Sequence, residues 1–124
     1  MTMSISLSDR GLLLGDGLFE TLLAVDGALQ RPRAHLDRMA ASCAVLGLPL
    51  PDRQAALIMM GAALARAGLT SGRAAVRLTL TAGSGGRGLV RPDGPELQMF
   101  ATAAAAHRPE AAARLALASV RRNP

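Results

Sequence analysis

Lysine is the most informative absence in this 124-residue sequence, because all 14 basic residues are arginines. A mechanism that needs a lysine amine as a nucleophile, a Schiff-base former or a phosphate clamp cannot be completed by residues of this chain. A full P-loop is excluded for the same reason, since its motif requires that residue. Any lysine-dependent chemistry associated with this sequence must draw the amine from elsewhere.

Aromatic residues and cysteine are also scarce. The chain has no tryptophan or tyrosine and two phenylalanines, Phe19 and Phe100. The formal net charge is +5, but the arginines are scattered and few rings are available to stack on bases, so nucleic-acid binding is not predicted. Cys43 is the single cysteine, which excludes an internal disulfide, and no cluster of zinc ligands is predicted from the pattern of histidine and cysteine.

Long apolar runs are missing as well. No stretch approaches the roughly 20 apolar residues of a membrane span, and the N-terminus lacks the pattern of a secretory signal. We therefore expect a cytoplasmic protein with no membrane association. Half of the residues are apolar and 19% are charged, which is typical of one globular domain at this length.

The clearest local pattern is a hairpin followed by two helices. Residues 18–25 and 28–30 are expected to form strands, because the Asp-Gly pair at 26–27 favours a type I′ turn. After Pro32, apolar residues repeat at helical spacing until Gly47, namely Leu36, Met39, Ala40, Cys43 and Leu46. A second helix is predicted from the N-cap Asp52 to Gly68, with its apolar face formed by Leu57, Ile58, Gly61, Leu64 and Ala65.

The period then changes from helical to alternating. Residues 73–81 place Val76, Leu78 and Leu80 on one side, as in a half-buried strand, and further strands are predicted over 96–103 and 113–120. This order of elements predicts an α+β fold, in which two helices cover one face of a mainly antiparallel sheet.

A glycine-rich segment follows the first of these strands. Gly83, Gly85 and Gly88 have the spacing G-x-G-x-x-G, but the two prolines and the glycine in 89–95 cannot open the helix that a dinucleotide site requires. We interpret the segment as a connection between strands. Its functional alternative rests on Arg87, whose planar guanidinium can bind a carboxylate or phosphate.

Other polar residues allow structural or functional interpretations. His35 and Arg38 lie three residues apart in a predicted helix, so their side chains can point at a common target. Taken one at a time, His35 is expected to be a structural residue that makes hydrogen bonds, and Arg38 a charge exposed to solvent. Glu20 is either outward-facing or buried with a partner. Asp9 and Asp16, in a turn-rich segment, are expected to accept hydrogen bonds from backbone amides.

Several motifs taken together resemble a known family. The segments DRG (9–11), GDGLFET (15–21), DG (26–27) and HLDRM (35–39) are similar to the N-terminal domain of class IV aminotransferases, the fold type IV enzymes that use pyridoxal 5′-phosphate. RLTLT (77–81), the loop at 83–88 and VRRNP (120–124) are most similar to the aminodeoxychorismate lyase branch. The resemblance extends over nearly the whole chain.

The resemblance implies a cofactor, a set of site residues and a partner. Arg38 is expected to contact the phosphate of pyridoxal 5′-phosphate, Arg87 a substrate carboxylate, and Phe19 the wall of the active site. The family's cofactor-binding lysine follows a segment like 121–124. We therefore expect residues 1–120 to be the N-terminal domain, 121–124 to begin a linker, and the C-terminal domain to be absent. This chain alone should then be inactive, and the intact enzyme should be a homodimer that binds a small molecule with carboxylates.

The predicted reaction is that of 4-amino-4-deoxychorismate lyase, which forms 4-aminobenzoate and pyruvate for folate synthesis. A branched-chain or other amino-acid aminotransferase is the alternative within the family. A stand-alone, non-catalytic α+β module whose arginines bind an anionic partner is the alternative from another class.

Overall fold

The hairpin forms where the sequence predicts it. The computed structural model describes residues 4–122. Strand β1 spans Gly17–Val25 and pairs antiparallel with β2, Ala28–Leu29. Asp26 and Gly27, between the strands, have φ angles of 48° and 77°, the positive values that a type I′ turn needs. The Asp-Gly prediction is confirmed.

A short helix that the sequence analysis did not predict, α1 (Arg10–Leu14), precedes β1. Asp9 caps it, because its Oδ1 accepts a hydrogen bond from the backbone N–H of Leu12 at 3.0 Å. Its Oδ2 accepts a second bond from Oγ1 of Thr81 at 2.7 Å. The expected bond to a backbone amide is thus present, and the second bond ties α1 to the end of a strand distant in sequence.

The two longer helices begin and end close to the predicted residues. Helix α2 spans Pro32–Leu46 and stops at Gly47, whose φ of 66° is left-handed. Helix α3 spans Arg53–Arg66, and the predicted N-cap Asp52 accepts a hydrogen bond from the backbone N–H of Ala55 at 3.0 Å. Within residues 4–122, no helix is long and apolar enough to cross a membrane.

The predicted buried face of α3 is confirmed at Leu64 and at Leu57, which packs against the core, but it is wrong at Ile58, Gly61 and Ala65, which are exposed. Ile58, assigned to that face, is 64% exposed. The residues that α3 buries are Ala56, Met60, Ala63 and Leu64. The helix carries apolar residues around most of its circumference, so periodicity alone did not identify the side that packs on the sheet.

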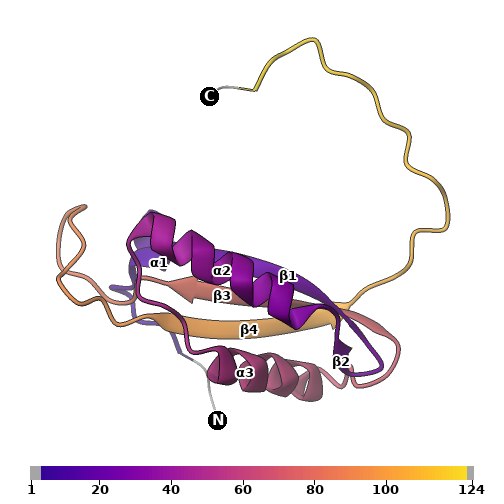
Figure 1. Ribbon diagram of the computed structural model, residues 1–124, viewed down its shortest axis with the longest axis horizontal. Helices are drawn as coiled ribbons and strands as arrows, with labels where there is room; N and C mark the ends of the chain where they lie inside the picture. The colour runs from indigo at the N-terminus through magenta and orange to yellow at the C-terminus, as the bar shows by residue number, and fades with distance from the viewer. Residues whose placement is uncertain (1–3, 123–124) are drawn as a thin grey trace.

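The sheet has the order β2-β1-β3-β4, and every neighbouring pair is antiparallel. Strand β3 spans Arg73–Thr81, and β4 spans Gln98–Ala105. Helix α2 packs against β1, and α3 packs against β3 and β4 (Figure 1). Buried side chains from both helices and from these three strands form one core, with Leu22, Met39, Met60 and Leu78 fully buried. The predicted α+β arrangement, with two helices on one face of the sheet, is confirmed.

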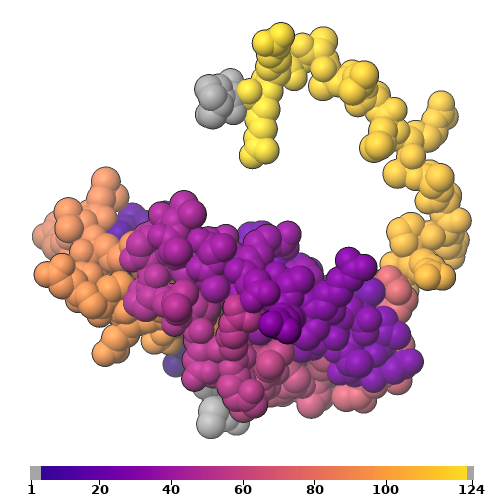
Figure 2. Space-filling view, viewed as in Figure 1, coloured from indigo at the N-terminus to yellow at the C-terminus, as the bar shows by residue number. Residues whose placement is uncertain are grey.

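Beyond β4 the chain forms no helix or strand as far as residue 122, where the described part ends. Figure 2 shows this segment, in yellow, standing clear of the folded body. The strand predicted over 113–120 is therefore wrong. Leu115, Leu117 and Val120 are 94%, 103% and 82% exposed, because no neighbouring strand pairs with their alternating pattern. The domain boundary at residue 120 stays a prediction, and residues 123–124 lie outside the described residues.

Candidate functional site

Strand β1 separates two polar clusters, because its side chains alternate between the faces of the sheet. Glu20 and Leu22 are buried on the face that α2 and α3 cover. Phe19 and Thr21 are exposed on the opposite face, which α2 and α3 leave open and which Gly11 and Leu12 of α1 border. Neighbouring residues of the motif GDGLFET therefore contribute to two different surfaces.

The first surface holds the helix-side cluster, which consists of Glu20, His35 and Arg38. Nε of Arg38 donates to Oε1 of Glu20 at 2.7 Å, and Nη2 of Arg38 donates to Oε2 at 2.6 Å. Nδ1 of His35 lies 2.7 Å from the same Oε2, which accepts the bond. The side chain of Glu20 is 6% exposed. The common target predicted for His35 and Arg38 is thus Glu20, which is buried with partners.

In this cluster, the ionised form of Glu20 and the charged form of Arg38 stabilise each other. The Arg38 guanidinium holds the pKa of Glu20 below its usual value, against an opposing effect of burial and with a further lowering by His35. In return, the carboxylate raises the pKa of Arg38. Charge-assisted hydrogen bonds of this kind are stronger than neutral ones. Glu20 therefore stays ionised at neutral pH and orients two side chains of α2.

Replacing Glu20 by glutamine should change how stability depends on pH. Because folding lowers the pKa of Glu20 below 4.5, its contribution is present above that pH and is lost as the pH falls through the folded value. The difference in unfolding free energy between the two proteins should thus shrink on acidification, by at most about 1.4 kcal/mol per pH unit for one proton. Urea unfolding between pH 3 and pH 7 measures it. Parallel pH profiles would show that Glu20 does not titrate differently in the folded chain.

One edge of Arg38 faces solvent despite its ion pair. The side chain is 68% exposed. A guanidinium has five N–H donors in a planar fork, and Glu20 occupies only donors on Nε and Nη2. Nη1 makes no hydrogen bond to any residue between 4 and 122. The exposed edge therefore has the donors that a phosphate group needs.

The second surface holds the open-face cluster, which consists of Phe19 and Arg77. The two residues lie on neighbouring strands, and the guanidinium carbon of Arg77 is 3.8 Å from the centre of the Phe19 ring. Phe19 is 54% exposed. They line a cavity of about 350 Å³ with Thr79 and Phe100. This cavity combines aromatic walls with a cation.

Sequence reasoning missed Arg77. The guanidinium makes no hydrogen bond or ion pair with the part of the chain that the structure describes. A charged residue in the middle of an apolar strand, out of phase with Val76 and Leu78, was the available signal. Its position beside Phe19 depended on the pairing of β1 with β3, which the local pattern does not specify.

The chain that follows the glycine-rich segment, between β3 and β4, is held by two arginines that share Asp16. Nε of Arg10 donates to Oδ2 of Asp16 at 2.7 Å, and Arg91 donates to both carboxylate oxygens at 3.1 and 2.7 Å. Arg10 also donates to the carbonyls of Leu89 and Val90. The expectation that Asp16 accepts bonds from backbone amides is wrong, because the guanidinium groups of Arg10 and Arg91 occupy its oxygens. We call this set the Asp16 clamp.

Arg87 lies within the glycine-rich segment, between Gly86 and Gly88. It is exposed and lines a groove of about 430 Å³ together with Leu13, Leu14 and Gly86. The three predicted site residues therefore lie in three places: Arg38 on α2, Phe19 on the open sheet face and Arg87 in the loop. A single copy of the described chain does not bring them into one pocket.

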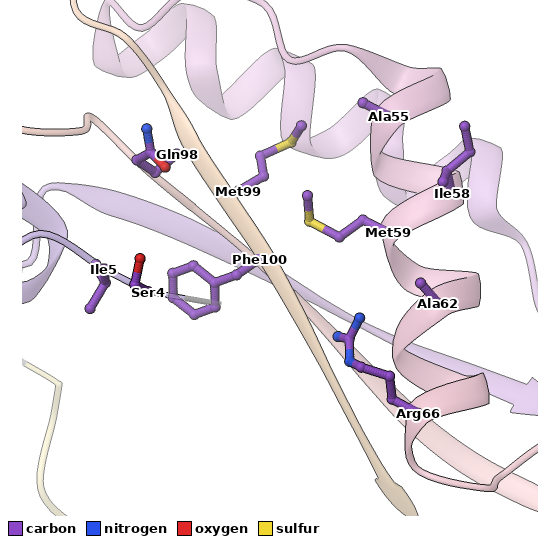
Figure 3. Close-up of a pocket in the computed structure, with 10 residues that line it drawn as sticks. All are labelled: Ser4, Ile5, Ala55, Ile58, Met59, Ala62, Arg66, Gln98, Met99 and Phe100. Carbon is purple, nitrogen blue, oxygen red and sulfur yellow. The ribbon is translucent and has the colours of Figure 1, made fainter. Parts of the chain in front are cut away.

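A further groove of about 640 Å³ lies between α3 and β4 (Figure 3). Met59 and Ile58 line it from the helix, and Met99 and Phe100 from the strand. Arg66 supplies the one charged side chain among its lining residues. The groove contains none of the predicted site residues, and its apolar lining offers few groups for chemistry.

The fold agrees with what comparison shows. The sequence profile of the class IV aminotransferase family matches residues 17–124. The chain belongs to this family.

Individual relatives add detail. The chain is 34% identical over 92 residues to an aminodeoxychorismate lyase of Vibrio harveyi, which covers 74% of the chain and 32% of the relative. The structure of 4-amino-4-deoxychorismate lyase from Pseudomonas aeruginosa matches with a TM-score of 0.68 and 31% identity, over 90% of this chain and 39% of that one. A hypothetical aminotransferase from Mycobacterium tuberculosis in its PLP-bound form matches with a TM-score of 0.68 and 28% identity, over 84% and 34%. The chain thus spans about a third of the length of these relatives.

Proposed function

We propose that this chain is the N-terminal domain, over residues 1–120, of a pyridoxal-phosphate enzyme with 4-amino-4-deoxychorismate lyase activity. The whole protein would release 4-aminobenzoate and pyruvate. The observation that carries this proposal is the similarity to lyases of that name over most of the chain, in sequence and in fold. An amino-acid aminotransferase is the second candidate, because the PLP-bound aminotransferase relative is 28% identical.

The cofactor proposal rests on Arg38. Its exposed edge would bind the phosphate group, while Glu20 and His35 hold the side chain against α2 and β1. When bound, pyridoxal phosphate supplies an electron sink for the elimination. The chain has no lysine, so the amine that binds the cofactor covalently must come from polypeptide outside these 124 residues. On this proposal the chain alone is inactive.

Three residues are proposed to bind the substrate. Arg87 would bind a carboxylate from the glycine-rich loop, where the Asp16 clamp restrains the segment that follows it. Phe19 would form a wall of the active site. To these we add Arg77, because its guanidinium lies on the Phe19 ring in a cavity of the open face.

The reaction is tested with protein expressed from the complete gene and supplied with the cofactor. The lyase proposal expects pyruvate and 4-aminobenzoate from 4-amino-4-deoxychorismate without an added keto acid. An aminotransferase would instead transfer the amino group only when a keto acid is present. A protein that neither binds the cofactor nor releases either product, but binds nucleic acid in a salt-dependent way, would favour the non-catalytic binding module.

Replacing Arg38 by alanine should weaken binding of pyridoxal 5′-phosphate by about tenfold or more, because a charge-assisted contact to the phosphate is lost. Absorbance titration of the cofactor-stripped protein gives the Kd. Arg53→Ala is the matched control, since Arg53 is also an exposed arginine, paired with Asp37 on α2. An Arg38→Ala protein with unchanged affinity would remove Arg38 from this role.

The same proposal includes the assembly and location of the protein. We propose a homodimer in the cytoplasm, in which the open face and the loop of each chain contribute to an active site completed by further polypeptide. Light scattering of the protein from the complete gene tests the dimer, and a monomer with full lyase activity would contradict it.

A further inference from the structure

We propose that Glu20 is a positioning residue, which holds Arg38 side-on so that the opposite edge of its guanidinium is presented to the phosphate of the cofactor. This inference rests on the function proposed for Arg38. It assigns a specific task to a buried acid that the resemblance left without one.

The geometry of the pair leaves room for a second anion. Glu20 binds the Nε–Nη2 side of the guanidinium at 2.7 and 2.6 Å. The remaining donors, on Nη1 and the outer position of Nη2, lie along a different edge of the same plane. A phosphate can bind that edge with two parallel hydrogen bonds while the carboxylate keeps its own. The ion pair and phosphate binding are therefore compatible.

Glu20 is held in a fixed position by the sheet, which explains why it can orient Arg38. Glu20 lies within β1, between the pairs that Phe19 and Thr21 make with β3, and its side chain is 6% exposed. Arg38, by contrast, is 68% exposed and would sample many rotamers without a partner. Binding to a fixed carboxylate removes that freedom before the ligand arrives, which lowers the entropic cost of binding.

His35 moderates the repulsion that Glu20 would exert on a nearby phosphate. Nδ1 of His35 and Nη2 of Arg38 both donate hydrogen bonds to Oε2 of Glu20. Donors from two residues therefore offset the negative charge of the carboxylate. The cluster therefore places a carboxylate behind the guanidinium and its exposed donors in front.

The test compares Glu20→Gln with Asp37→Asn, which makes the same charge change at an exposed site on α2 next to Arg38. The protein from the complete gene, stripped of cofactor, is titrated with pyridoxal 5′-phosphate and with pyridoxal, which lacks the phosphate. We expect Glu20→Gln to raise the Kd for pyridoxal 5′-phosphate about tenfold and to leave the Kd for pyridoxal unchanged. Asp37→Asn should alter neither value.

The direction of the change separates positioning from simple electrostatics. Removing a negative charge close to the site would strengthen binding of a phosphate if Glu20 acted only through repulsion. Weaker binding therefore supports the positioning role, whereas unchanged or tighter binding of pyridoxal 5′-phosphate overturns it. If the wild-type protein binds pyridoxal and its phosphate equally well, the proposed function of Arg38 fails instead.

A spectroscopic measurement and a second variant cover the case in which Glu20→Gln does not fold. In the wild-type protein, the Nε–H of Arg38 should give a distinct NMR signal protected from exchange with water, and its absence would overturn the proposal.

Arg38→Lys keeps the charge on an exposed helical position but cannot contact Glu20 and a phosphate through one planar fork. We expect it to bind pyridoxal 5′-phosphate about tenfold more weakly. Wild-type affinity in Arg38→Lys would also overturn the proposal.

Discussion

Replacing Asp16 by alanine is expected to lower the free energy of unfolding by up to about 3 to 5 kcal/mol, the cost of removing one partner of a fully buried ion pair. The side chains of Asp16 and Arg10 are 14% and 7% exposed. Without the carboxylate, Arg10 keeps its bonds to Leu89 and Val90 but remains a buried cation without an anion. Folded domains have a total stability of only about 5 to 15 kcal/mol, so this loss is a large fraction.

Urea unfolding followed by circular dichroism measures the change. Asp37→Ala is the matched control, because Asp37 is 56% exposed and pairs with an exposed arginine, a contact expected to contribute about 1 kcal/mol or less. Arg91→Ala should have a smaller effect than Asp16→Ala, since Arg91 is 25% exposed and Arg10 would retain its anion. Equal stability of Asp16→Ala and wild type would contradict a structural role for the Asp16 clamp.

Replacing Arg77 by alanine is expected to lower kcat/KM of the protein from the complete gene by about 100-fold, if the open-face cluster binds substrate as proposed. Hydrogen bonds to a charged group contribute about 1.5 to 3 kcal/mol, and the upper part of this range corresponds to such a factor. Stability should change little, because Arg77 is exposed and its guanidinium contacts the face of the Phe19 ring. Steady-state kinetics with 4-amino-4-deoxychorismate measures the effect.

Arg114→Ala is the control for this prediction, since it removes an exposed arginine from the segment that stands clear of the body (Figure 2). Its kcat/KM should stay within about twofold of wild type, because an exposed residue that makes no hydrogen bond or ion pair within residues 4–122 contributes little. Arg87→Ala tests the loop arginine in the same assay. Wild-type kinetics in Arg77→Ala would leave the open face without a role in substrate binding.

Local chemistry accounts for the elements that sequence analysis predicted well. The Asp26-Gly27 pair adopts the positive φ angles of a tight turn, Asp52 caps α3 with its own side chain, and Gly47 ends α2. Each of these features depends on residues a few positions apart, so the pattern contains all the information that is needed. The strand at 73–81 follows in the same way from its alternating side chains.

Two polar residues show where this reasoning stops. The sequence allows Glu20 either an outward-facing or a buried position, and it predicts that Asp16 accepts hydrogen bonds from backbone amides. Glu20 pairs with His35 and with Arg38, 15 and 18 residues away, and Asp16 pairs with Arg10 and with Arg91, 6 and 75 residues away. A carboxylate in an apolar run signals that a partner is needed, but several arginines could have supplied it.

Composition and short-range spacing were sufficient to predict the fold class, the turn, the helix ends and the absence of a lysine amine. These features depend on which residues are present and on their near neighbours in the sequence. The buried side of α3, the unpaired segment at 113–120, the Asp16 clamp and the contact between Arg77 and Phe19 required the assembled sheet. They depend on strand pairing and on which surface packs against which, and such contacts are made between residues far apart in the chain. For the same reason, the motif GDGLFET indicated a family, while the division of its side chains between two faces became visible only in three dimensions.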